Sequence, residues 1–114
     1  MSWDYENPCI IELIAEQEHI DGLNHVNNAV YVNWCEEAAW SHSVSLGFGL
    51  EEFQELDCAF AIRRSEYDYL LPTTLGEAVQ VATWITECDG RFSTVRSFQM
   101  IRLSDGAVLL RAKW

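Results

Sequence analysis

The chain has 114 residues, of which 49% are hydrophobic and 12% aromatic. This length suffices for one domain over residues 1–114 with a single buried core, and it leaves no room for a second domain. The composition excludes intrinsic disorder, because disordered chains are poor in apolar and aromatic residues. The formal net charge of −11 argues against binding of nucleic acid or of an anionic membrane through bulk electrostatics.

The charge is distributed unevenly along the chain. Residues 1–62 contain twelve acidic residues and no Lys or Arg, whereas residues 63–114 contain all seven basic residues and six acidic ones. We therefore expect any polyanionic ligand to contact the C-terminal half of the chain.

The four cysteines are widely spread, without a CxxC pair or a short Cys-His spacing. This pattern predicts reduced, mostly buried thiols and no metal site. No segment resembles a signal peptide, and nowhere do eighteen apolar residues follow one another. The sequence therefore predicts a cytoplasmic protein that does not enter a membrane.

The first half of the chain predicts a strand, a loop and a long helix. The β-branched and apolar run Cys9–Ala15 is typical of a strand, and the polar segment Glu16–Asn24, with its Asp21-Gly22 pair, of a loop. A helix is expected from about Asn28 to Leu46, capped by Asn27 or Asn28 and ended by Gly47. Apolar residues at helical spacing predict that it is largely buried: Val30, Tyr31, Trp34, Cys35, Ala38 and Ala39.

The second half is expected to form a sheet. A short helix is predicted over 49–56, followed by strands over 58–70, 78–86, 92–103 and from 107 onward. Turn residues separate these strands at 72–76, 89–90 and 105–106. The prediction is an α+β domain in which the long helix packs on a four-stranded antiparallel meander.

The segment His19–Glu37, HIDGLNHVNNAVYVNWCEE, brings a loop carboxylate next to the start of the helix. The first turn of a helix offers unpaired N–H groups and a positive dipole end, both of which stabilise a developing oxyanion. Asp21 is then a candidate nucleophile, or a candidate base that activates water. An Asp-Gly pair by itself is more often a simple turn.

The spacing of Asp21, Asn24, Val26 and Tyr31 resembles the active-site segment of the 4-hydroxybenzoyl-CoA thioesterase-like acyl-CoA hydrolases of the hotdog superfamily. Residues 34–38, 62–77 and 90–93 are similar to further segments of that family. The resemblance covers roughly residues 9–112. It implies a hotdog fold, a long central helix wrapped by an antiparallel sheet, with a last strand that relatives continue beyond Trp114.

The resemblance also implies an activity and a site. The expected reaction is hydrolysis of an acyl-CoA thioester without a metal or other cofactor, in a homodimer or homotetramer with sites at the subunit interface. Asp21 matches the catalytic nucleophile or general base, and the backbone N–H of Asn28 matches the oxyanion donor. His25 matches a histidine that acts in some relatives. The remaining expected contacts to substrate and CoA are Asn27, Tyr31, Arg91 and Ser93.

Three other functions stay open at this point. The sequence His25-Val26-Asn27-Asn28 is similar to plant acyl-ACP thioesterases, although an acidic carrier protein would need a local basic patch on this chain. A hotdog dehydratase would need an Asp-His dyad on the helix, which is not evident. A non-catalytic acyl-CoA-binding module is the alternative outside enzymes, because fold does not fix function.

Several polar residues have simpler interpretations. Arg63, Arg64 and Arg96, like Arg91, are candidates for phosphate contacts, but most surface arginines bind no ligand. Arg63 and Arg64 would point to opposite faces of one predicted strand. His42 is expected to serve in packing or to lie at the surface, and it is assigned no role.

Overall fold

The computed structural model describes residues 3–47, 62–88 and 94–114. Within these ranges the chain forms one helix, one short 3₁₀ segment and five strands. Their bounds in chain order are β1 Cys9–Ile14, η1 Gln17–His19, α1 Asn28–Ser45, β2 Glu66–Tyr69, β3 Ala78–Cys88, β4 Thr94–Arg102 and β5 Val108–Lys113.

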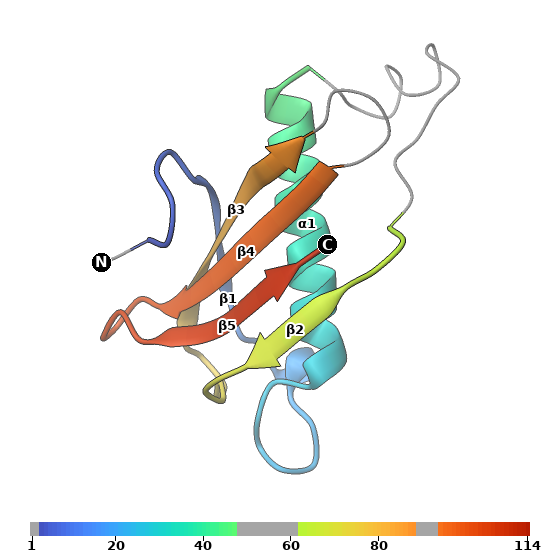
Figure 1. Cartoon of the computed structure of the whole chain (residues 1–114). Helices are drawn as coiled ribbons and strands as arrows, with labels where there is room; N and C mark the ends of the chain where they lie inside the picture. Colours follow the sequence, from blue (N-terminus) through green and yellow to red (C-terminus); the bar gives the residue numbers. More distant parts are fainter. Residues whose placement is uncertain (1–2, 48–61, 89–93) are drawn as a thin grey trace.

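The five strands form one antiparallel sheet in the order β1-β3-β4-β5-β2, and α1 packs across one face of it, mainly against β1 and β3 (Figure 1). The α+β class and the bounds of the helix are as predicted, but the helix is buried along one face and not largely buried, with Trp40 and Val44 exposed. Asn27 is the N-cap, and its side chain accepts a hydrogen bond from the Ala29 N–H at 2.9 Å.

The predicted four-stranded meander is wrong. Strands β3, β4 and β5 are neighbours in the sheet, as predicted. Strand β2, however, pairs with β5 at the edge of the sheet, from Glu66 opposite Lys113 to Tyr69 opposite Leu110. The 72–76 turn therefore carries the chain across the sheet instead of closing a hairpin. Strand β3 is paired with β1 on one side and with β4 on the other, so neither of its edges is open to β2.

The strand predicted over 58–70 is also too long. It begins only at Glu66, and residues 62–65 form irregular chain. Arg63 and Arg64 consequently do not alternate across a strand, and both are exposed. Residues 58–61 and the helix predicted over 49–56 lie outside the described residues, as does the turn predicted at 89–90.

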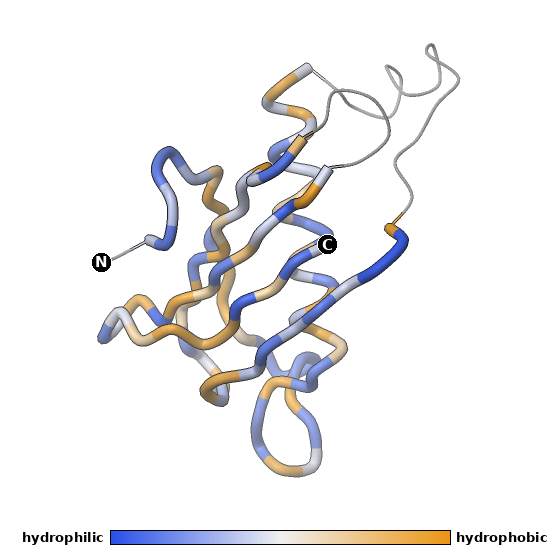
Figure 2. The backbone as a smooth tube through the Cα atoms, in the orientation of Figure 1, coloured by the Kyte–Doolittle hydropathy of each residue, from blue (hydrophilic) through white to orange (hydrophobic). Residues whose placement is uncertain are grey.

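The core lies between α1 and the sheet. The helix contributes Tyr31, Trp34, Cys35, Ala38 and Ala39, and its small alanines allow the sheet to approach closely. The alternation of strands aims one set of side chains at the helix: Val79, Val81, Phe98, Met100, Leu110 and Ala112. Figure 2 shows the matching mixture of hydrophobic and hydrophilic residues along the strands.

The sheet face opposite the helix is partly covered by the N-terminal segment. Trp3 and Tyr5 make edge contacts with the buried ring of Trp84, with ring centroids 6.2 and 5.4 Å away. Between them, Asp4 forms an ion pair with Arg111 at 2.7 Å. This segment explains why Trp84 is buried on a face that has no helix.

The cysteines are less buried than predicted. Among those described, Cys35 is buried, Cys9 is half-buried and Cys88 is exposed, and all three are free thiols. Burial raises the pKa of Cys35 to about 12, so this thiol is unsuited to act as a nucleophile. In the described part of the chain, no helix is long and apolar enough to cross a membrane.

Candidate active site

The segment 20–26, here called the Asp21 loop, is a compact turn closed at its base. An isolated β-bridge pairs Ile20 with Val26, and the Asp21 N–H donates to the carbonyl oxygen of His25 at 2.9 Å. The chain reverses through Asn24, whose φ is +63°, and not through Gly22. Asparagine tolerates this left-handed conformation because its short side chain can hydrogen-bond locally. Asp21 therefore lies at the fixed end of the loop.

The Asp21 carboxylate uses one oxygen within the loop and leaves the other available. Oδ1 accepts a hydrogen bond from the Leu23 N–H at 2.8 Å and a longer one from the His25 N–H at 3.4 Å. Oδ2 accepts none from any described residue. Asp21 is thus both the turn former that its Asp-Gly pair indicates and a carboxylate with one oxygen that accepts no hydrogen bond from the described residues.

The start of α1 supplies an unpaired donor. The Asn27 side chain accepts a hydrogen bond from the Ala29 N–H, and the Val30 N–H donates one to the Asn27 carbonyl oxygen at 2.9 Å. Within the described part of the chain, the Asn28 N–H finds no acceptor. This amide is the first of the helix, where the dipole of the backbone favours a negative charge.

Asp21 and Asn28 line the same hollow, an open depression of about 370 Å³ beside the helix N-terminus. The structure brings together all the predicted site residues that it describes: Asp21, His25, Asn27, Asn28 and Tyr31. Predicted Arg91 and Ser93 lie outside the described residues. The opposite wall is apolar and comes from Tyr69, Leu70, Leu71 and Pro72, which the sequence analysis did not assign to the site.

Tyr31 faces this hollow with a hydroxyl that already has a partner. The side chain is buried, and its hydroxyl donates to Oγ1 of the buried Thr73 at 2.8 Å. Burial raises the pKa of Tyr31, so the phenol stays protonated at neutral pH. Its ring makes edge contacts with Trp34 and Tyr69.

His25 is exposed and contributes to the loop through its backbone. No described residue forms a hydrogen bond with its ring. The neighbouring His19 is placed more firmly, because its Nδ1 accepts the Glu16 N–H at 2.9 Å and its ring meets Trp34 edge-on.

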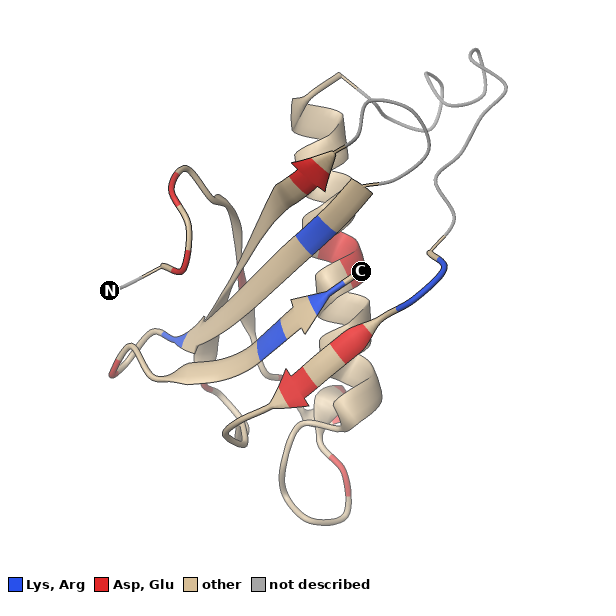
Figure 3. Cartoon of the chain, viewed as in Figure 1, with Lys and Arg blue, Asp and Glu red and all other residues tan. Residues whose placement is uncertain are grey.

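No described Lys or Arg lines the hollow, although Arg102 donates a hydrogen bond to the carbonyl oxygen of Pro72, which does. Figure 3 shows Lys and Arg on β4, on β5 and in the segment that leads into β2, and none on α1. Three of these arginines are in ion pairs: Arg64 with Glu66, Arg102 with Glu77 and Asp105, and Arg111 with Asp4. In the ranges that the structure describes, no cluster of three His, Cys, Asp or Glu side chains is placed to hold a metal ion.

A long helix packed on a five-stranded antiparallel sheet is the architecture of the hotdog fold. Residues 16–113 match the thioesterase-like superfamily, and the chain belongs to that family. The enzyme class predicted from the sequence is thereby confirmed at the level of the family.

Solved structures agree with this assignment. A 1,4-dihydroxy-2-naphthoyl-CoA thioesterase from Synechocystis superposes with a TM-score of 0.83 at 18% identity, over 94% of this chain and 78% of the other. A hypothetical protein from Staphylococcus aureus in complex with CoA superposes with a TM-score of 0.88 at 18% identity, over 99% of this chain and 70% of the other. An acyl-ACP thioesterase from Bacteroides thetaiotaomicron superposes with a TM-score of 0.82 at 25% identity, over 91% of this chain and 42% of the other. The hotdog fold is confirmed.

Proposed function

We propose that this protein hydrolyses an acyl-CoA thioester to a free carboxylic acid and CoA, with Asp21 as the catalytic carboxylate. The observation that carries the proposal is the shared hollow, which Asp21 and Asn28 line together with apolar residues. Among the described residues, Asp21 Oδ2 has no hydrogen-bond donor and the Asn28 N–H has no acceptor. A thioester needs these three elements: an activated nucleophile, an oxyanion donor and a surface for its acyl group.

In the general-base route, the Asp21 carboxylate removes a proton from a water molecule as its oxygen adds to the thioester carbonyl. The Asn28 N–H donates to the oxyanion that forms. Collapse of this intermediate breaks the carbon–sulfur bond, and the CoA thiolate leaves and takes up a proton. In the nucleophilic route, Asp21 itself adds to the carbonyl and expels the thiolate, and water then hydrolyses the resulting anhydride.

CoA is the expected carrier. The Staphylococcus aureus relative is described in complex with CoA, and the Synechocystis relative is named for a CoA thioester. Arg91 remains the predicted contact to its phosphates, and Ser93 a predicted contact to substrate or CoA. An acyl carrier protein is the alternative carrier, because one relative is described as an acyl-ACP thioesterase. The net charge of −11 disfavours binding of an acidic carrier protein to this chain.

A homodimer or homotetramer remains part of the proposal, as does the cytoplasmic location. The hollow is open, and one of its walls follows β2, which is an edge strand of the sheet. A second subunit beside this edge would enclose the substrate. The oligomeric state is measured by light scattering at the concentrations used for the assay.

The decisive test is thiol release from acetyl-CoA, palmitoyl-CoA and benzoyl-CoA by the wild type and by Asp21→Asn at equal folded concentration. We expect turnover of at least one substrate and a loss of about 100-fold or more in the variant, with binding retained. Equal rates would remove Asp21 from the mechanism. Binding without turnover in the wild type would favour a ligand-binding module, and turnover of an acyl-ACP alone would favour the protein carrier.

A further inference from the structure

Thr73 lies in the turn between β2 and β3 and is fully buried. Its carbonyl oxygen accepts a hydrogen bond from the Val26 N–H at 2.8 Å. Its Oγ1 accepts one from the Tyr31 hydroxyl, also at 2.8 Å and from a residue 42 positions away in the chain. One residue therefore contacts both the base of the Asp21 loop and the first turns of α1.

These two hydrogen bonds bracket the residues that carry the proposed oxyanion donor. Val26 immediately precedes the cap residue Asn27, and Tyr31 follows Asn28 by three positions, which is about one helical turn. Long side chains on a helix lean toward its N-terminus, so the side chain of Tyr31 lies over the turn that contains Asn28. A displacement of Thr73 would consequently displace the Asn28 N–H, and through Val26 the base of the loop that carries Asp21.

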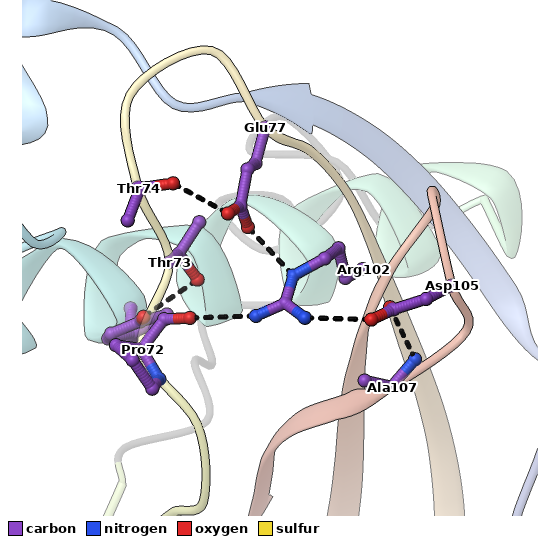
Figure 4. Close-up of polar contacts among 8 residues, drawn as sticks. Pro72, Thr73, Thr74, Glu77, Arg102, Asp105 and Ala107 are labelled. Carbon is purple, nitrogen blue, oxygen red and sulfur yellow. Dashed lines mark hydrogen bonds and ion pairs between the residues drawn. The ribbon is translucent and has the colours of Figure 1, made fainter.

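The turn that contains Thr73 is itself held on both sides (Figure 4). Arg102 donates from Nη2 to the Pro72 carbonyl at 3.1 Å and from Nε to Glu77 Oε2 at 2.9 Å. The other oxygen of Glu77 accepts from the Thr74 hydroxyl at 2.6 Å. With both neighbours of Thr73 fixed in this way, the turn is a rigid support for the helix start.

We infer that Thr73 is a positioning residue of the active site. Through Tyr31 and Val26, it fixes the position of the Asn28 amide relative to the Asp21 carboxylate. This inference rests on the acyl-CoA hydrolysis proposed above. The Tyr31 hydroxyl is then a structural donor to Thr73, and the substrate meets only the ring of this tyrosine.

The test is a double-mutant cycle measured by thiol release with the best substrate of the panel above. Thr73→Val keeps the shape and the backbone carbonyl but removes the acceptor, and Tyr31→Phe removes the donor. We expect each variant to lose about 10- to 100-fold in kcat with little change in KM, because misplacement of catalytic groups acts on the transition state. The double variant should lose no more than either single variant, and Thr73→Ser should restore most of the rate.

Thr83→Val is the matched control. Thr83 is also fully buried, and its hydroxyl donates to the Ser97 carbonyl at 3.1 Å, but it has no contact with the hollow. Its kcat should stay within about twofold of the wild type, a change that corresponds to less than about 0.5 kcal/mol. If Thr73→Val does not fold, Tyr31→Phe carries the same test, since it removes one oxygen from the same hydrogen bond.

The outcomes separate this inference from the proposed function. If Asp21→Asn abolishes turnover while Thr73→Val and Tyr31→Phe match the control, Thr73 has no positioning role and the proposed function stands. Losses that multiply in the double variant would also overturn the inference, because independent effects do not pass through one hydrogen bond. If Asp21→Asn keeps full activity, or the wild type hydrolyses no thioester, the proposed function fails and the inference falls with it.

Discussion

Arg96 donates a hydrogen bond from Nη1 to Nδ1 of His42 at 2.9 Å, across the interface between β4 and α1. The same nitrogen donates to Thr83 Oγ1 at 3.2 Å. His42 must therefore be neutral, with its proton on Nε2. Burial, and secondly the positive charge of Arg96, lower the pKa of His42 below 6.5.

This pair predicts a specific loss of stability in acid. A histidine with a lowered pKa binds fewer protons in the native state than in the unfolded state. Its contribution to stability is present above pH 6.5 and is lost as the pH falls through the lowered pKa. Urea unfolding of the wild type and of His42→Gln between pH 8 and pH 5 should show the wild type losing more stability below pH 6.5. Parallel curves would mean that His42 has the same pKa in the folded and the unfolded state.

The amide of Asn28 can be removed without removing the helix. Proline is favoured at the first helical position, where its missing N–H has no helical partner. The preceding Asn27 has φ −62° and ψ 140°, a conformation that a residue before proline adopts readily. We expect Asn28→Pro to fold and to lose about 100-fold or more in kcat, as on loss of an oxyanion donor.

Asn28→Ala is the matched control for that variant, because it changes the side chain and keeps the N–H. It should retain most of the activity. Circular dichroism confirms that both variants contain the helix. Equal activity of Asn28→Pro and Asn28→Ala would assign the oxyanion to another donor.

The nucleophilic and general-base routes proposed for Asp21 can be distinguished by isotope labelling. In a single turnover in oxygen-18 water, the nucleophilic route leaves label in the Asp21 carboxylate when water adds to the Asp21 carbonyl of the anhydride, and the product acid then keeps an unlabelled Asp21 oxygen. The general-base route labels only the product. Asp21 Oδ2, which accepts no hydrogen bond from a described residue, suits either route, and label in the peptide that contains Asp21 would establish the nucleophilic one.

The ion pair of Arg102 with Glu77 is expected to stabilise the fold measurably. The Arg102 side chain is only 20% exposed and donates to Glu77, Asp105 and the Pro72 carbonyl. Arg102→Met should lower the free energy of unfolding by about 1–3 kcal/mol, because it leaves hydrogen-bonding groups of the 72–77 turn unpaired.

Arg111→Met tests whether this effect is specific. Arg111 also forms a bidentate ion pair, with Asp4, but its side chain is 47% exposed. Such pairs contribute about 1 kcal/mol or less. Similar losses in the two variants would show that the partial burial of Arg102 adds nothing.

The two described cysteines at the extremes of exposure should differ in reactivity. Cys35 is buried with a pKa of about 12, whereas Cys88 is exposed. Iodoacetamide at pH 8, followed by peptide mass spectrometry, should label Cys88 within minutes and Cys35 only in urea. Because the raised pKa belongs to the folded state, stability from this thiol is complete below pH 9 and is lost toward pH 12. Labelling of both thiols at one rate would contradict the burial of Cys35.

The local parts of the fold were predictable from the sequence, and the pairing of its strands was not. The helix, its Asn27 cap and the run Cys9–Ile14 follow from residue types and spacing within a few positions. The partner of β2 depends instead on which remote edge is free, and Glu66–Tyr69 finds it in β5, about forty residues later. No signal in residues 58–70 distinguishes that pairing from a hairpin with β3.

The same distinction between local sequence and remote pairing applies to the residues of the candidate site. Asp21, His25, Asn27, Asn28 and Tyr31 belong to one continuous segment, so a motif of eleven residues predicts all of them. Tyr69 lines the hollow, and Thr73 contacts its residues Tyr31 and Val26, because β2 lies at the far edge of the sheet beside β5. Two threonines after a proline indicate a turn, but they carry no sign of what that turn supports.

The bridge between Ile20 and Val26 separates the tip of the Asp21 loop from its base. Leu23, at the tip, is 78% exposed and lines the hollow, while Asp21 is held at the base. We expect substitutions of Leu23 to alter the surface that meets the acyl group of the proposed substrate and to leave the carboxylate in place, because Leu23 contacts Asp21 through its backbone N–H. This loop is therefore a natural target for directed evolution, in which acyl selectivity is varied at Leu23 while Asn24, whose φ is +63°, is kept.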